Sequence, residues 1–165
     1  MKKIFILATA IAMTVAACKP ELKGDLGDPA NKLEGMAGTW EITSFKQQDP
    51  NNPIREERDL SEFYIIDGLS PYRLSFNKDS MTYSVAAGPG KNYFGTGGHW
   101  AFDNPNYPTY LYLYTATDTL QTLLGSVVRP SDSQLNIQLE NYCEGADGSR
   151  TTTAIYTFTF NRLNP

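Results

Sequence analysis

The chain offers few side chains of the kinds that catalyse reactions or bind metals. It has one histidine, His99, and two cysteines, Cys18 and Cys143, among 165 residues. A zinc site or a Ser-His-Asp triad would have to be built on His99, and the sequence has no Gly-x-Ser-x-Gly turn to hold a nucleophilic serine. The pair Gly90-Lys91 lacks the other residues of a phosphate-binding loop. We therefore expect no metal, no cofactor and no catalytic residue.

Cys18 is the residue whose surroundings predict a definite chemical reaction. Two lysines precede twelve mostly apolar residues, Ile4 to Val15, which would reach only about 18 Å as a helix, short of the roughly 30 Å membrane core. Such a segment is typical of an export signal. The residues just before the cysteine, Val15-Ala16-Ala17, resemble the lipobox of bacterial lipoproteins. The resemblance implies a signal peptide over 1–17, cleavage before Cys18 and a membrane anchor through lipid on its sulfur.

The segment after Cys18 shows neither helix nor strand periodicity. It is polar and interrupted by glycine and proline, which is typical of a flexible linker. We expect a tether over 18–35 and one domain over 36–165. No aspartate directly follows Cys18, which by resemblance to known sorting rules favours the outer membrane, at its periplasmic or external face. Loss of the leader with its two lysines shifts the formal charge from −4 to −6, and an acidic chain predicts no nucleic-acid partner.

From Gly38 onward the chain consists of short runs rich in Tyr, Phe, Thr, Ile and Val, separated by Gly, Pro, Asn and Asp. Large apolar residues alternate with polar ones in several runs, for example Leu135, Ile137 and Leu139. This alternation predicts antiparallel strands with one buried face. Eight such runs predict an all-β fold, an eight-stranded antiparallel barrel. The runs are 38–46, 72–77, 80–87, 98–103, 109–115, 120–128, 134–141 and 152–162.

The connection over 47–71 is much longer than the others. Asp59 and Glu62 stand at the two positions of a helix capping box. We therefore expect one or two helical turns between the first and second strands. Leu60 and Phe63 are expected to point inward and close one end of the barrel.

The first strand carries a family resemblance. Gly38-Thr39-Trp40 resembles the Gly-x-Trp signature of the lipocalin and calycin group. The resemblance implies that a late arginine packs on this tryptophan at the barrel floor, and Arg162 has the matching position. The mature chain is also similar to lipocalin-like lipoproteins of Bacteroidetes, a family catalogued as a domain of unknown function. The similar stretches are 33–42, 59–60, 98–104, 129–132 and 134–135.

The residues expected to face the barrel interior are large, and half of them are aromatic. Such bulk favours a filled interior over a ligand cavity. Any pocket is then expected at the barrel mouth, where an aromatic rim could stack on a sugar or a small apolar molecule. Ordinary packing of the mouth loops on the barrel is the alternative explanation for the same side chains, and the sequence favours it. The rim residues are Tyr93, Phe94, Trp100, Tyr107 and Tyr110.

Three classes of function remain. The first, which we expect, is a non-catalytic envelope lipoprotein that binds a small apolar molecule or a glycan. The second is a structural or inhibitory partner of an outer-membrane complex, which would show an exposed apolar patch, for instance around Leu111 and Leu113. The third is an enzyme, for which no acid/base pair stands out.

Cys143 is expected to be buried as a small apolar residue. The sequence leaves the oligomeric state open.

Overall fold

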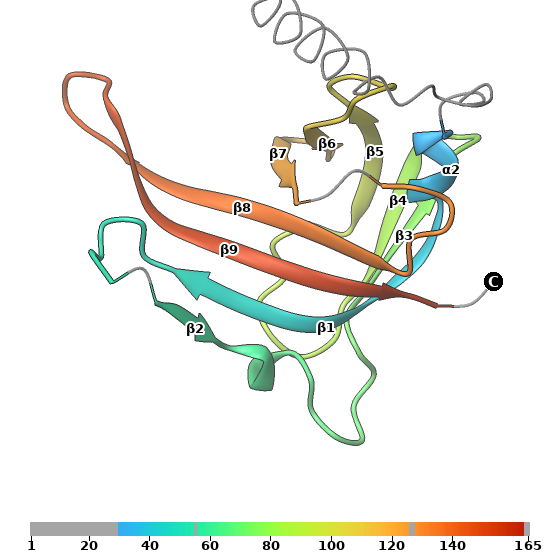
Figure 1. Ribbon diagram of the computed structural model, residues 1–165, viewed down its shortest axis with the longest axis horizontal. Coiled ribbons are helices and arrows are strands. Elements are labelled where there is room, and N and C mark those ends of the chain that lie inside the picture. The colour runs from blue at the N-terminus through green and yellow to red at the C-terminus, as the bar shows by residue number, and fades with distance from the viewer. Residues whose placement is uncertain (1–29, 55, 126–127, 164–165) are drawn as a thin grey trace, which may run out of the picture.

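The computed structural model describes residues 30–54, 56–125 and 128–163, and nearly all of its regular structure is β (Figure 1). The predicted signal peptide, Cys18 and most of the predicted tether lie outside these residues. The elements are α2 (Lys32–Met36), β1 (Gly38–Gln48), β2 (Glu57–Asp59), the 3-10 helix η1 (Ser61–Phe63), β3 (Arg73–Asn77), β4 (Thr82–Ala86), β5 (Gly97–Phe102), β6 (Tyr110–Tyr114), β7 (Thr119–Leu124), β8 (Gln134–Glu144) and β9 (Arg150–Arg162).

Eight of these strands close into an antiparallel barrel. From β3 to β9 each strand pairs with the next along the chain, and β1 pairs with β3 on one side and with β9 on the other. The β1–β9 pairing runs from Trp40 opposite Arg162 to Gln48 opposite Ile155. The predicted all-β barrel is confirmed, and each predicted run overlaps one barrel strand. The closed barrel is also consistent with the lipocalin-like architecture that the resemblance implies.

Two elements were not predicted. β2 pairs with the outer end of β1, where Lys46 lies opposite Asp59. All three residues of β2 are exposed, so its sequence shows no alternation of apolar and polar residues. Helix α2 falls within the range predicted as a tether. Its five residues are too few for a visible period, and its start is fixed by Asn31, whose side chain accepts the N–H groups of Leu33 and Glu34. Met36 at its end is fully buried, so the folded domain includes this helix.

The helical segment between β1 and β3 was predicted correctly, and Leu60 packs against the core as expected, but Phe63 does not. The Ser61 N–H donates to the Asp59 carboxylate at 2.9 Å, but the N-cap of η1 is Leu60 and no side-chain hydrogen bond caps it, so the predicted capping box of Asp59 and Glu62 does not form. Phe63, however, is 53% exposed, so its predicted inward orientation was wrong. Leu60 has non-helical backbone angles, and the spacing that would place both side chains on one face does not apply. Tyr64 closes the barrel instead: it is 2% exposed and its hydroxyl donates to the Lys91 carbonyl.

Large side chains fill the barrel interior, as predicted. Both tryptophans are buried, and most of the buried aromatic rings form two groups of contacting rings, one around Trp100 and one around Phe158. Phe94 comes from the loop between β4 and β5, folds inward, and places its ring 5.0 Å from that of Phe158 and 6.2 Å from that of Phe160. This loop residue therefore occupies space that a ligand would need in an open barrel.

Candidate functional site: a cleft between β7 and β8

Trp40 and Arg162, the two residues assigned to the barrel floor, lie in contact. The guanidinium carbon of Arg162 is 4.4 Å from the centre of the Trp40 indole ring. Arg162 also donates to the carbonyls of Gly35, Ala37 and Asp132, and the Trp40 indole N–H donates to the Met36 carbonyl at 2.9 Å. The last carbonyls of a helix have no partner within the helix. The floor pair thus docks the end of α2 against the barrel.

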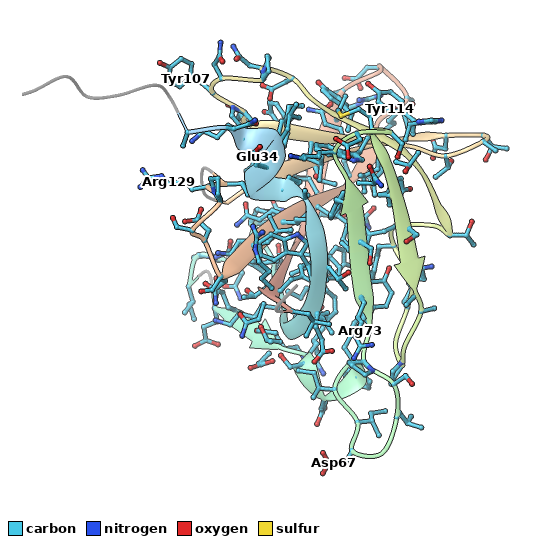
Figure 2. The ribbon with its side chains drawn as sticks, turned by 90° about the vertical axis from the view of Figure 1, so that its right-hand side faces the viewer. Glu34, Asp67, Arg73, Tyr107, Tyr114 and Arg129 are labelled. Carbon is cyan, nitrogen blue, oxygen red and sulfur yellow. The ribbon has the colours of Figure 1, made fainter. Side chains whose placement is uncertain are left out.

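Three of the five residues assigned to a ligand rim do not lie on one. Trp100 and Phe94 are each 1% exposed. The Trp100 indole donates to the Asn77 carbonyl at 3.1 Å, and the Phe94 N–H donates to the side chain of Asn92, which bends the loop inward. Tyr107 is 75% exposed, and Figure 2 shows it at the end of the molecule where Glu34 of α2 lies. These three residues form no common surface.

Tyr93 and Tyr110, the other two rim residues, line an open cleft of about 670 Å³ between β7 and β8. The cleft is built by both strands, by the loop before β5, by the loop between β6 and β7, and by the start of β9. Its lining residues are Lys91, Tyr93, Tyr110, Asp118, Thr119, Leu120, Gln121, Leu123, Gln138, Leu139, Glu140, Asn141, Tyr142, Arg150, Thr152 and Tyr156.

The cleft exists because β7 and β8 separate after two residue pairs. Leu123 lies opposite Gln138 and Leu124 opposite Ile137. The same register would next pair Thr122 with Leu139 and Gln121 with Glu140, but the ladder stops. β8 instead continues with β9 as a long hairpin, which Figure 1 shows projecting away from the short strands β6 and β7. The two diverging strands form the walls of the cleft.

Four tyrosines line the cleft, and two of them contact each other. The rings of Tyr93 and Tyr156 lie 5.3 Å apart, and that of Tyr156 stacks on Phe45 of β1 at 5.8 Å. The Lys91 ammonium lies 4.7 Å from the centre of the Tyr93 ring. Burial, together with the neighbouring Tyr156, raises the pKa of the Tyr93 hydroxyl above its usual value. This hydroxyl is therefore a neutral hydrogen-bond donor at physiological pH.

Most charged groups at the cleft already have a partner. Arg150 pairs with Glu144 at 2.9 Å and lies over the Tyr142 ring, 4.5 Å from its centre. The Asp118 carboxylate accepts the N–H of Thr119 at 2.7 Å. Glu140 accepts only a long bond of 3.3 Å from the Thr152 hydroxyl. The cleft thus offers hydroxyl, amide and carboxylate groups beside its aromatic rings.

The reactive side chains identified in the sequence do not gather at the cleft. His99 is an exposed residue of β5, next to the buried Trp100. Cys143 is exposed, so its predicted burial was wrong; it lies on the part of β8 that extends beyond the barrel, where there is no core to bury it. Among the described residues, no three His, Cys, Asp or Glu side chains are placed to hold a metal ion.

Sequence reasoning missed most of the cleft, including Tyr156, Leu120 and the outer half of β8. One signal was available. The alternation of Leu135, Ile137 and Leu139 ends at Asn141, where the next apolar residue would stand, and an interrupted alternation indicates where a strand leaves the core. The sequence of β7, which forms the opposite wall, gives no comparable signal, because which strands pair depends on the three-dimensional fold.

Comparisons with known proteins add no relative. No family model matches the chain, and no curated protein is detectably similar to it. In the part of the chain that the structure describes, no helix has the length and apolar character needed to cross a membrane.

Proposed function

We propose that the protein is a non-catalytic lipoprotein of the cell envelope, anchored in the outer membrane through Cys18, whose lipocalin-like barrel binds a glycan or a small apolar molecule. The observation that carries the binding function is the open cleft of about 670 Å³ between β7 and β8. Its volume is in the range of ligand sites, and its tyrosines offer flat apolar faces with polar tips. The anchor rests on the lipobox-like residues before Cys18, which lie outside the described structure.

The acid/base properties of the carboxylates support a non-catalytic role. A general acid needs a pKa near the working pH, which requires a carboxyl group whose pKa is raised. The carboxyl groups whose pKa differs clearly from the usual value are shifted downward instead. Hydrogen bonds from Ser61 lower the pKa of Asp59, and hydrogen bonds from Ser149 lower that of Asp147. At Asp103 burial opposes the shift, but backbone N–H groups outweigh it and lower the pKa.

Native mass spectrometry of the protein purified from its source tests the binding function. We expect a co-purifying molecule whose adduct is lost in Tyr156→Ala, which removes one ring of the aromatic pair, and kept in Tyr107→Ala. Tyr107 is the matched control because it is exposed and outside the cleft. An adduct that survives Tyr156→Ala would place the ligand elsewhere, and protein without any bound molecule would count against the proposal.

The anchor is tested separately by replacing the cysteine. Radiolabelled palmitate should enter the wild-type protein and should not enter Cys18→Ser, which should accumulate as the uncleaved precursor. Label in the serine variant would contradict lipid attachment at this residue. The exposed Cys143 supplies the control, because Cys143→Ser should incorporate label normally.

A second function is favoured by one surface feature, an exposed apolar loop at the other end of the barrel from α2. The apolar patch considered around Leu111 and Leu113 does not exist, since both residues are fully buried. Phe63, Ile66 and Leu69 are instead 53%, 46% and 57% exposed, on the loop whose tip is marked by Asp67 in Figure 2. Such a patch is typical of a protein-interaction surface. A photo-crosslinker at Ile66, but not one at the exposed Asn106, should capture an envelope protein if this loop docks on a partner.

A further inference from the structure

We infer that the cleft between β7 and β8 binds a neutral oligosaccharide, with its sugar rings on the tyrosine pair and its hydroxyl groups on the polar strand edges. This inference rests on the proposed binding function and narrows its ligand. Three features of the cleft carry it: the distribution of apolar and polar groups, the balance of charge, and the condition of the two strand edges.

Apart from Leu123, which shares a face with Gln121 and Tyr110, the two walls place their apolar and polar side chains on opposite faces. Leu120 lies opposite Leu113, which is fully buried, and Leu139 lies opposite Tyr156. Cross-strand partners point to the same face, so both leucines face the core. Their neighbours Gln121, Gln138 and Glu140 must point to the other face. The cleft therefore has an apolar floor and polar lips.

A sugar ring has the complementary chemistry. Its C–H groups form an apolar face that stacks on aromatic rings, and its hydroxyls surround that face at the edge. Inside the cleft lie the rings of Tyr93 and Tyr156, and along its polar strand edges lie the amide side chains of Gln121 and Gln138. A purely apolar ligand would leave these amides without partners, which costs free energy. The space that would suit such a ligand, the barrel interior, is filled by Phe94.

The charges that line the cleft favour a neutral ligand. Two cations, Lys91 and Arg150, are balanced by two carboxylates, Asp118 and Glu140. Arg150 is paired with Glu144, whereas the neutral Thr119 N–H that Asp118 accepts leaves the charge of this carboxylate in place. Lys91 therefore stands against two carboxylates, Asp118 and Glu140, so an anionic ligand meets no excess of positive charge.

The strand edges count against the other polar ligand, an extended peptide that would add a strand in the gap. Regular strand addition needs a straight edge with open N–H and C=O groups. The β8–β9 ladder shifts register between Asn141 and Tyr142, where β9 carries the extra residue Thr153 and the hairpin bends. On β7 the Thr119 N–H is occupied by the Asp118 carboxylate. A bend in one wall and a blocked amide in the other both oppose regular strand pairing.

Isothermal titration of the full mature chain carrying Cys18→Ser tests the inference. The probes are maltohexaose, cellohexaose, mannohexaose and xylohexaose, compared with hexagalacturonic acid, palmitate and a neutral valine–threonine hexapeptide. We expect at least one neutral hexasaccharide to bind more tightly than all three comparison probes. Tyr156→Ala should weaken that binding by at least about tenfold, and Tyr107→Ala should leave it unchanged.

A second variant is needed because Tyr156 also packs on Phe45, so that misfolding of Tyr156→Ala would also abolish binding. Glu140→Ala removes an exposed lip carboxylate and should weaken the same saccharide severalfold with an unchanged melting temperature. Tighter binding of palmitate, hexagalacturonic acid or the peptide would overturn the neutral-oligosaccharide inference and leave a binding function in place. If no probe of any class binds, the proposed function fails together with the inference.

Discussion

Trp40 and Arg162 lie opposite each other where β1 meets β9, with the guanidinium carbon 4.4 Å from the indole centre. The contact joins the first strand to the last, so it fixes the seam at which the barrel closes. The same two side chains also bind the final carbonyl groups of α2. The barrel floor and the preceding helix therefore depend on a single pair of residues.

Replacing Arg162 should destabilise the protein far more than replacing another arginine in a similar contact. Arg162→Met keeps the apolar stem but removes the donors to Gly35, Ala37 and Asp132. Since buried acceptors without partners are costly, we expect a loss of about 2–3 kcal/mol in the free energy of unfolding. Urea denaturation followed by tryptophan fluorescence measures it.

Arg150 provides the matched control. It also lies over a ring, that of Tyr142, but its side chain is 63% exposed. Arg150→Met should change the unfolding free energy by less than about 0.5 kcal/mol. Equal losses for the two variants would show that Arg162 has no special structural role.

Gly98 should tolerate no side chain, because β5 and β6 approach closely there. A Cβ atom at this position would lie 1.9 Å from the carbonyl oxygen of Tyr114. That oxygen belongs to the backbone of β6 and cannot move away without disturbing the strand pair. We expect Gly98→Ala to cost about 3 kcal/mol, at the upper end for overpacking, as measured by thermal unfolding.

Gly148 separates this clash from the general effect of losing a glycine. It has a φ of +79° and open space around it. Gly148→Ala should cost only about 1 kcal/mol, the penalty of the left-handed backbone conformation. A variant Gly98→Ala as stable as Gly148→Ala would mean that the two strands can separate without loss.

The strands were predictable from the sequence because they follow a local rule. A run such as Leu135, Ile137 and Leu139 reveals its buried face by alternation alone. The contact of Trp40 with Arg162 joins distant segments. It was predictable only because Gly38-Thr39-Trp40 resembles the lipocalin signature, and this resemblance implies the contact.

The cleft was not predictable because it results from where two strands stop pairing. Tyr93 and Phe94 are adjacent aromatic residues in one loop, yet Phe94 is 1% exposed and Tyr93 lines the cleft. The difference is set by Asn92, whose side chain accepts the Phe94 N–H and donates to the Gly95 carbonyl at 2.6 Å. The sequence alone does not show that Phe94 fills the barrel interior while the preceding Tyr93 lines the cleft.

Cys143 should react rapidly with thiol reagents in the native protein. It is exposed on the outer part of β8, where no core side chain covers it. In the mature chain carrying Cys18→Ser, we expect a thiol-specific maleimide to label one cysteine at the same rate with and without urea. Protection of the thiol until the protein unfolds would contradict the exposed position, and the additional variant Cys143→Ser should take up no label.

The folded protein should lose stability in alkaline solution because of its buried tyrosines. Burial, aided by neighbouring tyrosines, raises the pKa of Tyr64 and Tyr72 well above the usual value. Both hydroxyls donate hydrogen bonds in the folded state, to the Lys91 carbonyl and the Asn92 side chain. The unfolded chain releases these protons near pH 10, while the folded protein retains them.

The unfolded state therefore binds fewer protons above about pH 10, and the free energy of unfolding must fall as the pH rises. Each of the two tyrosines should contribute a decrease of about 1.4 kcal/mol per pH unit until its folded pKa is reached. Urea midpoints measured between about pH 8 and pH 11 should show this slope. The double variant Tyr64→Phe/Tyr72→Phe should flatten it, whereas Tyr107→Phe, outside the barrel, should not. An unchanged slope in the double variant would mean that other groups cause the alkaline transition.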